Sequence, residues 1–494
     1  MSSRTVKAFF PSISTLLYCF ALLLPESGLA HSFGEPYQLP MPYWMYIYGA
    51  MAALILSFVV LALFINSSSA PPERFQKTWT SRRAYQFIQC FRLIGLIKTL
   101  VCGSFLLALV AGLIGSGDSY RNFNMTFFWI VFALGGVYLS ALIGDWYAHF
   151  NPWKILANSL PGFQQARITY PTRLAYWPAL MLYMGFIGLE LFGDIKPFSL
   201  SVSLLIFTAI QLLGCFLFGS KHWFHYGDFF AVMFRLSALM SPCTLHQQQI
   251  DKQNPALTLT LRIPFSGLLN QRPEHFSLLV FLLFMLSSTA FDGLRETALW
   301  FNLFWKDPFN ILTPLLGRNP IYEYVMLRPW YIGFESLTLV ISPFIYLGLF
   351  LVFLWLGKII TASKDSLLTL ANQFAFSLLP IALVYHITHY YTLLLSQGVK
   401  IRGLISDPFG WGWNLFGTAI TGRIPVLPDM GFIWDSQVWL ILIGHVASVW
   451  IAHFEALRYF PSHRKASLSQ LPMLALMVLF TGAGLWILAQ PLQG

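Results

Sequence analysis

The stretch "PIALVYHITHYYTLLL" (residues 380–395) is the most informative part of the sequence for the fold class. It is apolar enough to cross a membrane, and yet it carries His386 and His389. A polar group without a partner in hydrocarbon is costly, so an intramembrane histidine marks a candidate functional site. The stretch therefore predicts a transmembrane helix whose histidines meet polar groups on neighbouring helices.

The composition of the whole chain agrees with a membrane protein. Of its 494 residues, 56% are hydrophobic and 10% are charged, whereas roughly a quarter of the residues of a soluble domain are charged. Long apolar runs recur along the chain, which predicts an all-α, polytopic transmembrane helical bundle surrounded by the lipid bilayer. Basic inner loops account for the net charge of +10, so nucleic acid is not an expected partner.

The N-terminus has the features of a secretory signal peptide. Arg4 and Lys7 give a basic start, residues 9–25 are apolar, and "SGLA" supplies the small residues that precede a cleavage site. Cleavage of residues 1–30 before His31 would leave residues 31–494 as a single polytopic membrane domain. An uncleaved first helix is the alternative interpretation.

Ten apolar segments that are long enough to cross a bilayer follow the predicted signal peptide. They comprise residues 42–66, 94–117, 123–145, 175–193, 197–218, 276–292, 330–357, 366–396, 434–456 and 471–490. With the mature N-terminus outside, the inner loops contain 18 lysines and arginines and the outer loops contain 9. This bias follows the positive-inside rule and predicts a multi-pass protein of the bacterial inner membrane with both mature termini on the periplasmic side.

The largest predicted inner loops are residues 67–93 and 219–275. The second loop contains "HWFHYGDFFAVMFRLSALM" (residues 222–240), a short amphipathic stretch in which histidines, Asp228 and Arg235 stand among apolar residues. Such a stretch predicts an amphipathic helix that lies along the inner surface of the membrane.

Three histidines fall at matching depth in the outer half of the predicted bundle. His386 lies about ten residues below the outer end of its segment, which corresponds to ~15 Å along an α-helix. His445 reaches a similar depth in the next segment, so we expect the two to face each other. His389 lies one helical turn above His386 on the same face. His453 lies ~12 Å deeper than His445 and is not expected to join them.

These histidines predict a metal centre. Neutral imidazoles with a carboxylate are suitable ligands for a divalent transition metal, and zinc and copper are the expected ions. The predicted ligands are His386, His389 and His445, and a mature N-terminus could add His31. The structural alternative is that each intramembrane histidine is only hydrogen-bonded between helices.

Carboxylates and tyrosines supply the other candidate groups. Asp292 closes one predicted segment and Glu335 opens the next, and either could act as a base or as a further metal ligand. Tyr385 and Tyr390 flank the histidines and could orient a substrate oxygen. These four are the predicted catalytic residues of a metal-dependent hydrolase, whose lipophilic small-molecule substrate would arrive through the bilayer.

Two other classes of protein suit the same residues. Intramembrane histidines also serve transporters of metal ions or small solutes, although the chain lacks a clear inverted repeat. Histidines on facing helices could instead clamp a haem in an electron-transfer subunit, which would leave His389 and His453 unexplained. The hydrolase interpretation itself lacks a recognised motif such as HExxH or GxSxG.

Four stretches of the chain resemble one known family. "AHSFGEPYQLPMPYWMYIYGA", "PIALVYHITHYYTLLL", "SDPFGWGWNLFGTA" and "LILIGHVASVWIAHFEAL" are similar to the bacterial membrane proteins called fenitrothion hydrolases. The similarity covers most of the mature chain, and it implies hydrolysis of a lipophilic organophosphorus ester. It includes the positions of His31, His386, His389, His445 and His453, but it implies no catalytic role for any of them.

Overall fold

The structure is a computed structural model, which describes residues 30–32, 35–37, 42–65, 76–251, 254–420 and 428–490. In these ranges nine helices are long and apolar enough to cross a membrane, and one shorter apolar helix accompanies them. The chain is therefore an all-α polytopic bundle, as the sequence predicts. The predicted signal peptide lies outside the described residues except for its last position, in the short strand β1 (Ala30–Ser32). β1 pairs with β2 (Glu35–Tyr37), and the side chain of His31 also lies outside the described part.

The ten apolar helices correspond to the ten predicted segments. Their bounds are α2 (Tyr43–Phe64), α4 (Leu93–Ile114), the run α5 (Phe123–Met125), η2 (Thr126–Leu134) and α6 (Gly135–Ile143), α9 (Trp177–Phe192), α10 (Pro197–Tyr226), α12 (Phe276–Arg295), α15 (Tyr324–Thr361), the run α16 (Leu367–Phe374), η5 (Ala375–Leu378) and α17 (Leu379–Gln397), α19 (Met430–Tyr459) and α20 (His463–Ala489). α15 and α20 begin earlier than predicted. Both contain prolines in their interior, Pro329 in α15 and Pro472 in α20, which argue for a later start from sequence alone.

Shorter helices connect these elements. They are α3 (Arg82–Cys90), α7 (Tyr147–Phe150), α8 (Pro152–Ser159), α11 (Phe229–Ala238), η3 (Ser266–Leu268), α13 (Ala298–Trp305), α14 (Thr313–Leu316), η4 (Pro320–Glu323), η6 (Gly398–Lys400) and α18 (Ile401–Ser406).

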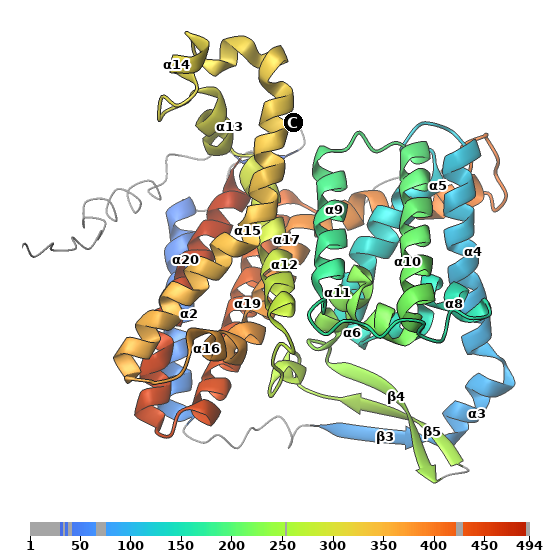
Figure 1. The fold of residues 1–494 in the computed structure, drawn as a ribbon, viewed down its shortest axis with the longest axis horizontal. Coiled ribbons are helices and arrows are strands. Elements are labelled where there is room, and N and C mark those ends of the chain that lie inside the picture. Colours follow the sequence, from blue (N-terminus) through green and yellow to red (C-terminus); the bar gives the residue numbers. More distant parts are fainter. Residues whose placement is uncertain are drawn as a thin grey trace, which may run out of the picture.

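Two groups of helices lie side by side (Figure 1). In one group α19 packs against α2 and α20, and α15 packs against α20; in the other, α10 packs against α4, and α11 against α6. α12 and α17 join the groups, because α12 contacts α9 as well as α15, and α17 contacts η2 as well as α19. Most residues of α12 and the first half of α17, Leu379–Tyr385, are buried, which explains why these stretches are mainly apolar around the helix.

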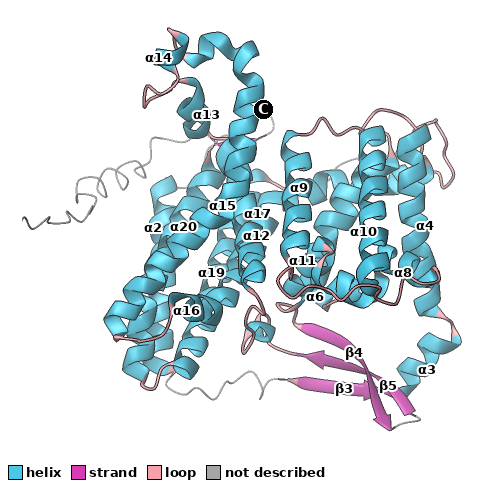
Figure 2. Cartoon of the chain, in the orientation of Figure 1, coloured by secondary structure: helices cyan, strands magenta, loops and turns pink. Residues whose placement is uncertain are grey.

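The two ends of the bundle differ. At one end, which we call the α13 end, α13, α14 and the first turns of α15 project beyond the other helices (Figure 1). At the opposite end, which we call the sheet end, a small antiparallel sheet lies beneath the helices (Figure 2). Its strands are β3 (Lys77–Ser81), β5 (Asn254–Leu261) and β4 (Cys243–Asp251), in that order.

The sheet was not expected from the sequence, which assigns its residues to loops. Trp79 of β3 pairs with Leu259 of β5, and Leu259 pairs in turn with Leu245 of β4. β3 belongs to the predicted loop 67–93, and β4 and β5 belong to the predicted loop 219–275. Their pairing places both loops at the same end of the bundle, which is consistent with the predicted topology.

The prediction of a surface helix at residues 222–240 is wrong. α11, which lies within this stretch, has nearly all of its side chains buried between α6, α9 and α10. Asp228 caps its first turn by accepting a hydrogen bond from the N–H of Phe230 (3.1 Å), and Asn151 Nδ2 donates to the same carboxylate (2.8 Å). Because these bonds satisfy the polar groups at the helix start, the helix can enter the bundle instead of lying on it.

One transmembrane helix contains a nine-residue π-helix, η2 (Thr126–Leu134), between α5 and α6. A π-helix is wider than an α-helix, is rarely longer than one turn, and is often found at functional sites. Six of the residues of η2 are buried against the rest of the bundle. This helix lies between the two groups, where it contacts α17.

Candidate functional site

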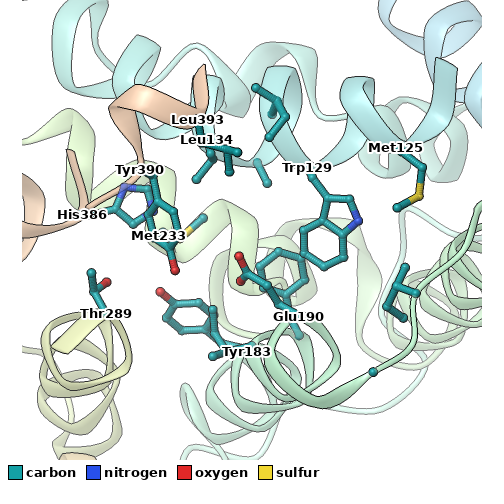
Figure 3. Close-up of a pocket in the computed structure, with 16 residues that line it drawn as sticks. Met125, Trp129, Leu134, Tyr183, Glu190, Met233, Thr289, His386, Tyr390 and Leu393 are labelled. Carbon is teal, nitrogen blue, oxygen red and sulfur yellow. The ribbon is translucent and has the colours of Figure 1, made fainter. Parts of the chain in front are cut away.

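A cavity of about 290 Å³ lies between the two groups of helices. η2 forms one wall with Trp129, and α9 and α11 form another with Phe186 and Met233. α12 and α17 close the remaining side (Figure 3). The lining includes Met125, Gly193 and Ile195, which lie at the α13 end of their helices, so the cavity lies toward that end. Its volume is close to the lower limit of small-molecule sites, roughly 300 Å³.

Polar side chains from three helices converge on this mostly apolar cavity. Glu190 and Tyr183 come from α9, Thr289 from α12, and His386 and Tyr390 from α17. Figure 3 shows the carboxylate of Glu190 and the hydroxyl of Tyr183 directed towards the space that His386 and Tyr390 border. A few convergent polar groups in an apolar cavity are the usual composition of a ligand or active site.

A hydrogen-bonded cluster supports one side of the cavity. His389 Nε2 and Tyr390 Oη both donate to Oδ2 of Asp292, each at 2.8 Å. The His389 and Asp292 side chains are largely buried, at 16% and 15% exposure. The carboxylate on α12 thus fixes two successive residues of α17, one of which, Tyr390, lines the cavity.

The ring of His386 stands between two tyrosines. Its centroid lies 5.0 Å from the ring of Tyr390 and 5.8 Å from that of Tyr138. His386 Nδ1 and Tyr138 Oη are both buried, and neither has a hydrogen-bond partner among the described residues. Buried polar atoms without partners are rare, and they often belong to groups with a functional role. His386 is therefore the histidine of α17 that is available for chemistry in the cavity.

The predicted ligand His445, whose Nε2 has no hydrogen-bond partner among the described residues, and His453 both lie on α19, outside the cavity lining. Nδ1 of His445 donates to the carbonyl of Ile441 at 2.8 Å. The imidazole ring is buried and is not among the residues that line the cavity. His453 uses both ring nitrogens, toward the carbonyl of Ile65 (3.2 Å) and Gln470 Nε2 (3.2 Å). The prediction that His453 stands apart from the other histidines thus agrees with its contacts.

Two of the four predicted catalytic residues also lie away from the cavity. Oε1 of Glu335 accepts a hydrogen bond from Trp300 Nε1 (3.2 Å), between α15 and α13. Tyr385 faces α20, where its hydroxyl is 3.4 Å from the carbonyl of Gly484. Asp292 and Tyr390 are the two that the structure brings together, although as hydrogen-bond partners of each other.

The predicted metal ligands are not gathered at one point. Within the described ranges, no group of three His, Cys, Asp or Glu side chains is placed so that it could hold a metal ion. His389 is paired with Asp292, His386 faces the cavity, and His445 lies on another helix face. The residues thus do not fit a zinc or copper centre as they are arranged, and that centre stays a prediction from the sequence.

Several cavity residues could not be recognised from sequence. Glu190 closes an apolar segment like an ordinary end-of-helix carboxylate, and Trp129 resembles the aromatic residues found at membrane interfaces. The signal that could have singled out Glu190 is its place one helical turn before the segment end, on the same face as Tyr183 and Phe186. Only the packing of α9 against α12 and α11 shows that this face borders a cavity.

Comparisons with protein-family models, curated proteins and solved structures found no match. The function is therefore inferred from the geometry of the cavity.

Proposed function

We propose that this chain is a membrane-embedded hydrolase of a small lipophilic ester, with the cavity between the two helix groups as its active site. The observation that carries the proposal is His386, an imidazole that borders the cavity, contacts the ring of Tyr138 and has an Nδ1 without a partner among the described residues. A neutral histidine that borders a ligand cavity is the commonest general base of hydrolytic sites.

The proposed roles follow from these positions. His386 acts as a neutral imidazole whose proton is on Nδ1, so that Nε2 is the basic atom. Nε2 takes a proton from water, and the water oxygen forms a bond to the phosphorus or carbonyl carbon of the ester. The bond to the leaving oxygen then breaks, its electron pair stays on that oxygen, and the proton on His386 is transferred to it. No other reactant is needed.

Asp292 and His389 are positioning residues in this scheme. They hold the hydroxyl of Tyr390 at 2.8 Å from the carboxylate, and so they fix the tyrosine ring that packs on His386. A ring fixed in this way limits the rotamers of His386, and orientation of a catalytic group contributes strongly to rate. The sequence hypothesis of Asp292 as the base is replaced here, because its carboxylate is already occupied by two donors.

The shape of the cavity favours an enzyme over a transport path. Beyond Phe186 toward the sheet end, the rings of Phe229 and Phe230 lie 5.1 and 5.5 Å from it. Aromatic side chains therefore fill the route through this half of the bundle, whereas a transporter needs polar groups along it. We propose further that the α13 end faces the periplasm of a bacterial inner membrane, as the distribution of lysine and arginine predicts.

The resemblance to fenitrothion hydrolases supports the same reaction class. An organophosphorus ester is neutral and lipophilic, so it would partition into the bilayer and reach a half-buried site from there. A metal-dependent form of the hydrolysis is a separate prediction from the sequence, because the reaction with His386 as general base needs no metal.

The test is hydrolysis by the purified protein. Full-length protein in detergent is assayed with chromogenic organophosphorus and carboxylic esters, next to His386→Gln and Tyr138→Phe. We expect His386→Gln to lower kcat by about 10²–10⁴-fold, the usual contribution of a general base. His453→Gln is the matched control, since it alters a histidine outside the cavity. Wild-type protein that hydrolyses no ester, or a His386→Gln variant as active as the control, would contradict the proposal.

A further inference from the structure

The cavity combines one carboxylate with several aromatic faces. Trp129, Tyr183, Phe186 and Tyr390 line it together with Glu190. No lysine or arginine is among its lining residues in the described part of the chain. Aromatic faces carry negative potential, so they attract cations in the same way as the carboxylate does.

Glu190 is not directly paired with any residue that the structure describes. No described residue forms a hydrogen bond or an ion pair with its carboxylate. The nearby guanidinium of Arg295 is already bound, donating from Nη1 to the carbonyl of Leu191 (2.8 Å) and pairing through Nε with Glu296 (3.0 Å). Asp292 adds a further negative group behind Tyr390. A buried carboxylate is costly unless it is paired, and a bound cation would supply the missing partner.

The aromatic residues are arranged around this carboxylate. Trp129 stacks on Phe186 with ring centroids 5.1 Å apart and an interplanar angle of 28°, which fixes the plane of the indole. Figure 3 shows Glu190 between Trp129 on one side and Tyr183 and Tyr390 on the other. A cation next to Glu190 would therefore contact ring faces as well as the carboxylate. Such aromatic cages are the common recognition site of quaternary ammonium groups.

We propose that the cavity binds a small organic cation, with a substituted ammonium group held by Glu190 among Trp129, Tyr183 and Phe186. As a statement about substrate, this rests on the proposed function and narrows it: the ester would be amphiphilic rather than neutral, with the ammonium group at one end and its reacting centre beside His386 at the other. As a statement about binding, it holds without any hydrolysis. Gly193 and Ile195 place the site near the α13 end of the bundle, so we expect a charged ligand to enter from the water on that side.

The test is equilibrium binding to the full chain in detergent, followed by tryptophan fluorescence and calorimetry. The probe is benzyltrimethylammonium, and the comparison ligand is neopentylbenzene, which has the same shape with carbon in place of nitrogen. We expect the cation to bind at least about tenfold more tightly than its neutral counterpart, because only the cation gains the interaction with Glu190 and the rings. This comparison needs no variant, so it does not depend on the folding of a mutant.

Substitutions then locate the site. Glu190→Gln and Trp129→Leu should each weaken benzyltrimethylammonium binding by about tenfold, while Glu335→Gln, a buried carboxylate outside the cavity, should leave it unchanged. Equal affinity for the two probes, or unchanged binding in Glu190→Gln, would overturn the inference. Cation binding that persists in a protein without hydrolytic activity would support the inference while the proposed function fails. Hydrolysis of neutral esters without any cation binding would support the proposed function and contradict the inference of a cation site.

Discussion

His389 on α17 and Asp292 on α12 form a hydrogen-bonded pair, with 2.8 Å between Nε2 and Oδ2. The pair joins the two helices that connect the two groups of the bundle, and it lies directly behind the cavity wall. A single contact at this place therefore affects both the stability of the bundle and the geometry of the candidate active site.

Removing one partner of this pair should be strongly destabilising. We expect Asp292→Ala to lower the free energy of unfolding by about 3–5 kcal/mol, because it leaves two buried donors without their acceptor. Glu296→Gln is the control, since it breaks the more exposed pair with Arg295 and should cost less than about 1 kcal/mol. Unfolding of both variants in detergent, followed by size-exclusion chromatography after heating, compares them. Equal midpoints for the two would show that the Asp292 pair is not structural.

Two tyrosines on α17 provide a matched test of the site. Tyr390→Phe removes the hydroxyl that Asp292 holds, so we expect kcat to fall about tenfold or more while KM changes little. Tyr385→Phe removes a hydroxyl on the opposite face, at Gly484, and should leave kcat unchanged. Steady-state kinetics on the ester that the wild type hydrolyses would distinguish them. If both variants keep the wild-type rate, the Tyr390 hydroxyl has no part in positioning His386.

The predicted metal can be tested by elemental analysis of the purified protein. The sequence hypothesis expects bound zinc or copper that is lost in His386→Ala, His389→Ala and His445→Ala. Because His445 lies outside the cavity lining, we expect His445→Ala to have the same metal content as the wild type. Loss of metal from all three variants alike would show that these side chains rearrange to form one centre.

The orientation in the membrane follows from labelling of cysteines in intact cells. Cys90 is exposed in α3 at the sheet end, so a membrane-impermeant maleimide should not reach it from outside. Leu315→Cys, in an exposed position of α14 at the α13 end, should be labelled readily. The opposite pattern would reverse the orientation and place the cavity at the cytoplasmic side.

Processing of the N-terminus is a separate prediction. The small residues of "SGLA" before His31 predict cleavage at that position. The mass of the intact purified protein should then correspond to residues 31–494. A chain that begins at Met1 or Ser2 would exclude a free amino group at His31 and would leave the first apolar segment in the membrane.

The transmembrane helices could be predicted because hydrophobic length alone determines them. The limits of α2, α4 and α12 are close to those expected, since few other structures satisfy the backbone in hydrocarbon. The burial of α11 could not be predicted in the same way. Its single arginine and its flanking histidines suggest a surface helix, and only Asp228 and Asn151 reveal how its polar start is satisfied inside the bundle.

The candidate site was predictable in part, for a similar reason. The depth of His386 and His389 follows from counting residues, and the acidic partner of His389 was among the expected residues. The rotation of each helix about its axis was not accessible, so His445 and Tyr385 were assigned to a site that they do not face. Glu190 was recognised as one of the carboxylates of the outer half, but it was assigned no role because a carboxylate near the end of a segment is ordinary in sequence.

The π-helix η2 has a consequence for how this cavity can change over evolutionary time. A π-helical turn is equivalent to one residue added to an α-helix. Deleting a single residue between Thr126 and Leu134 would therefore restore α geometry and rotate the preceding part of the helix by about 100° relative to α6. Trp129 would then leave the cavity wall, and the contacts of α5 with α4 and α10 would change with it. Related chains that differ by one residue here would share the fold and present a cavity of different shape, so ligand preference could diverge by a change in chain length.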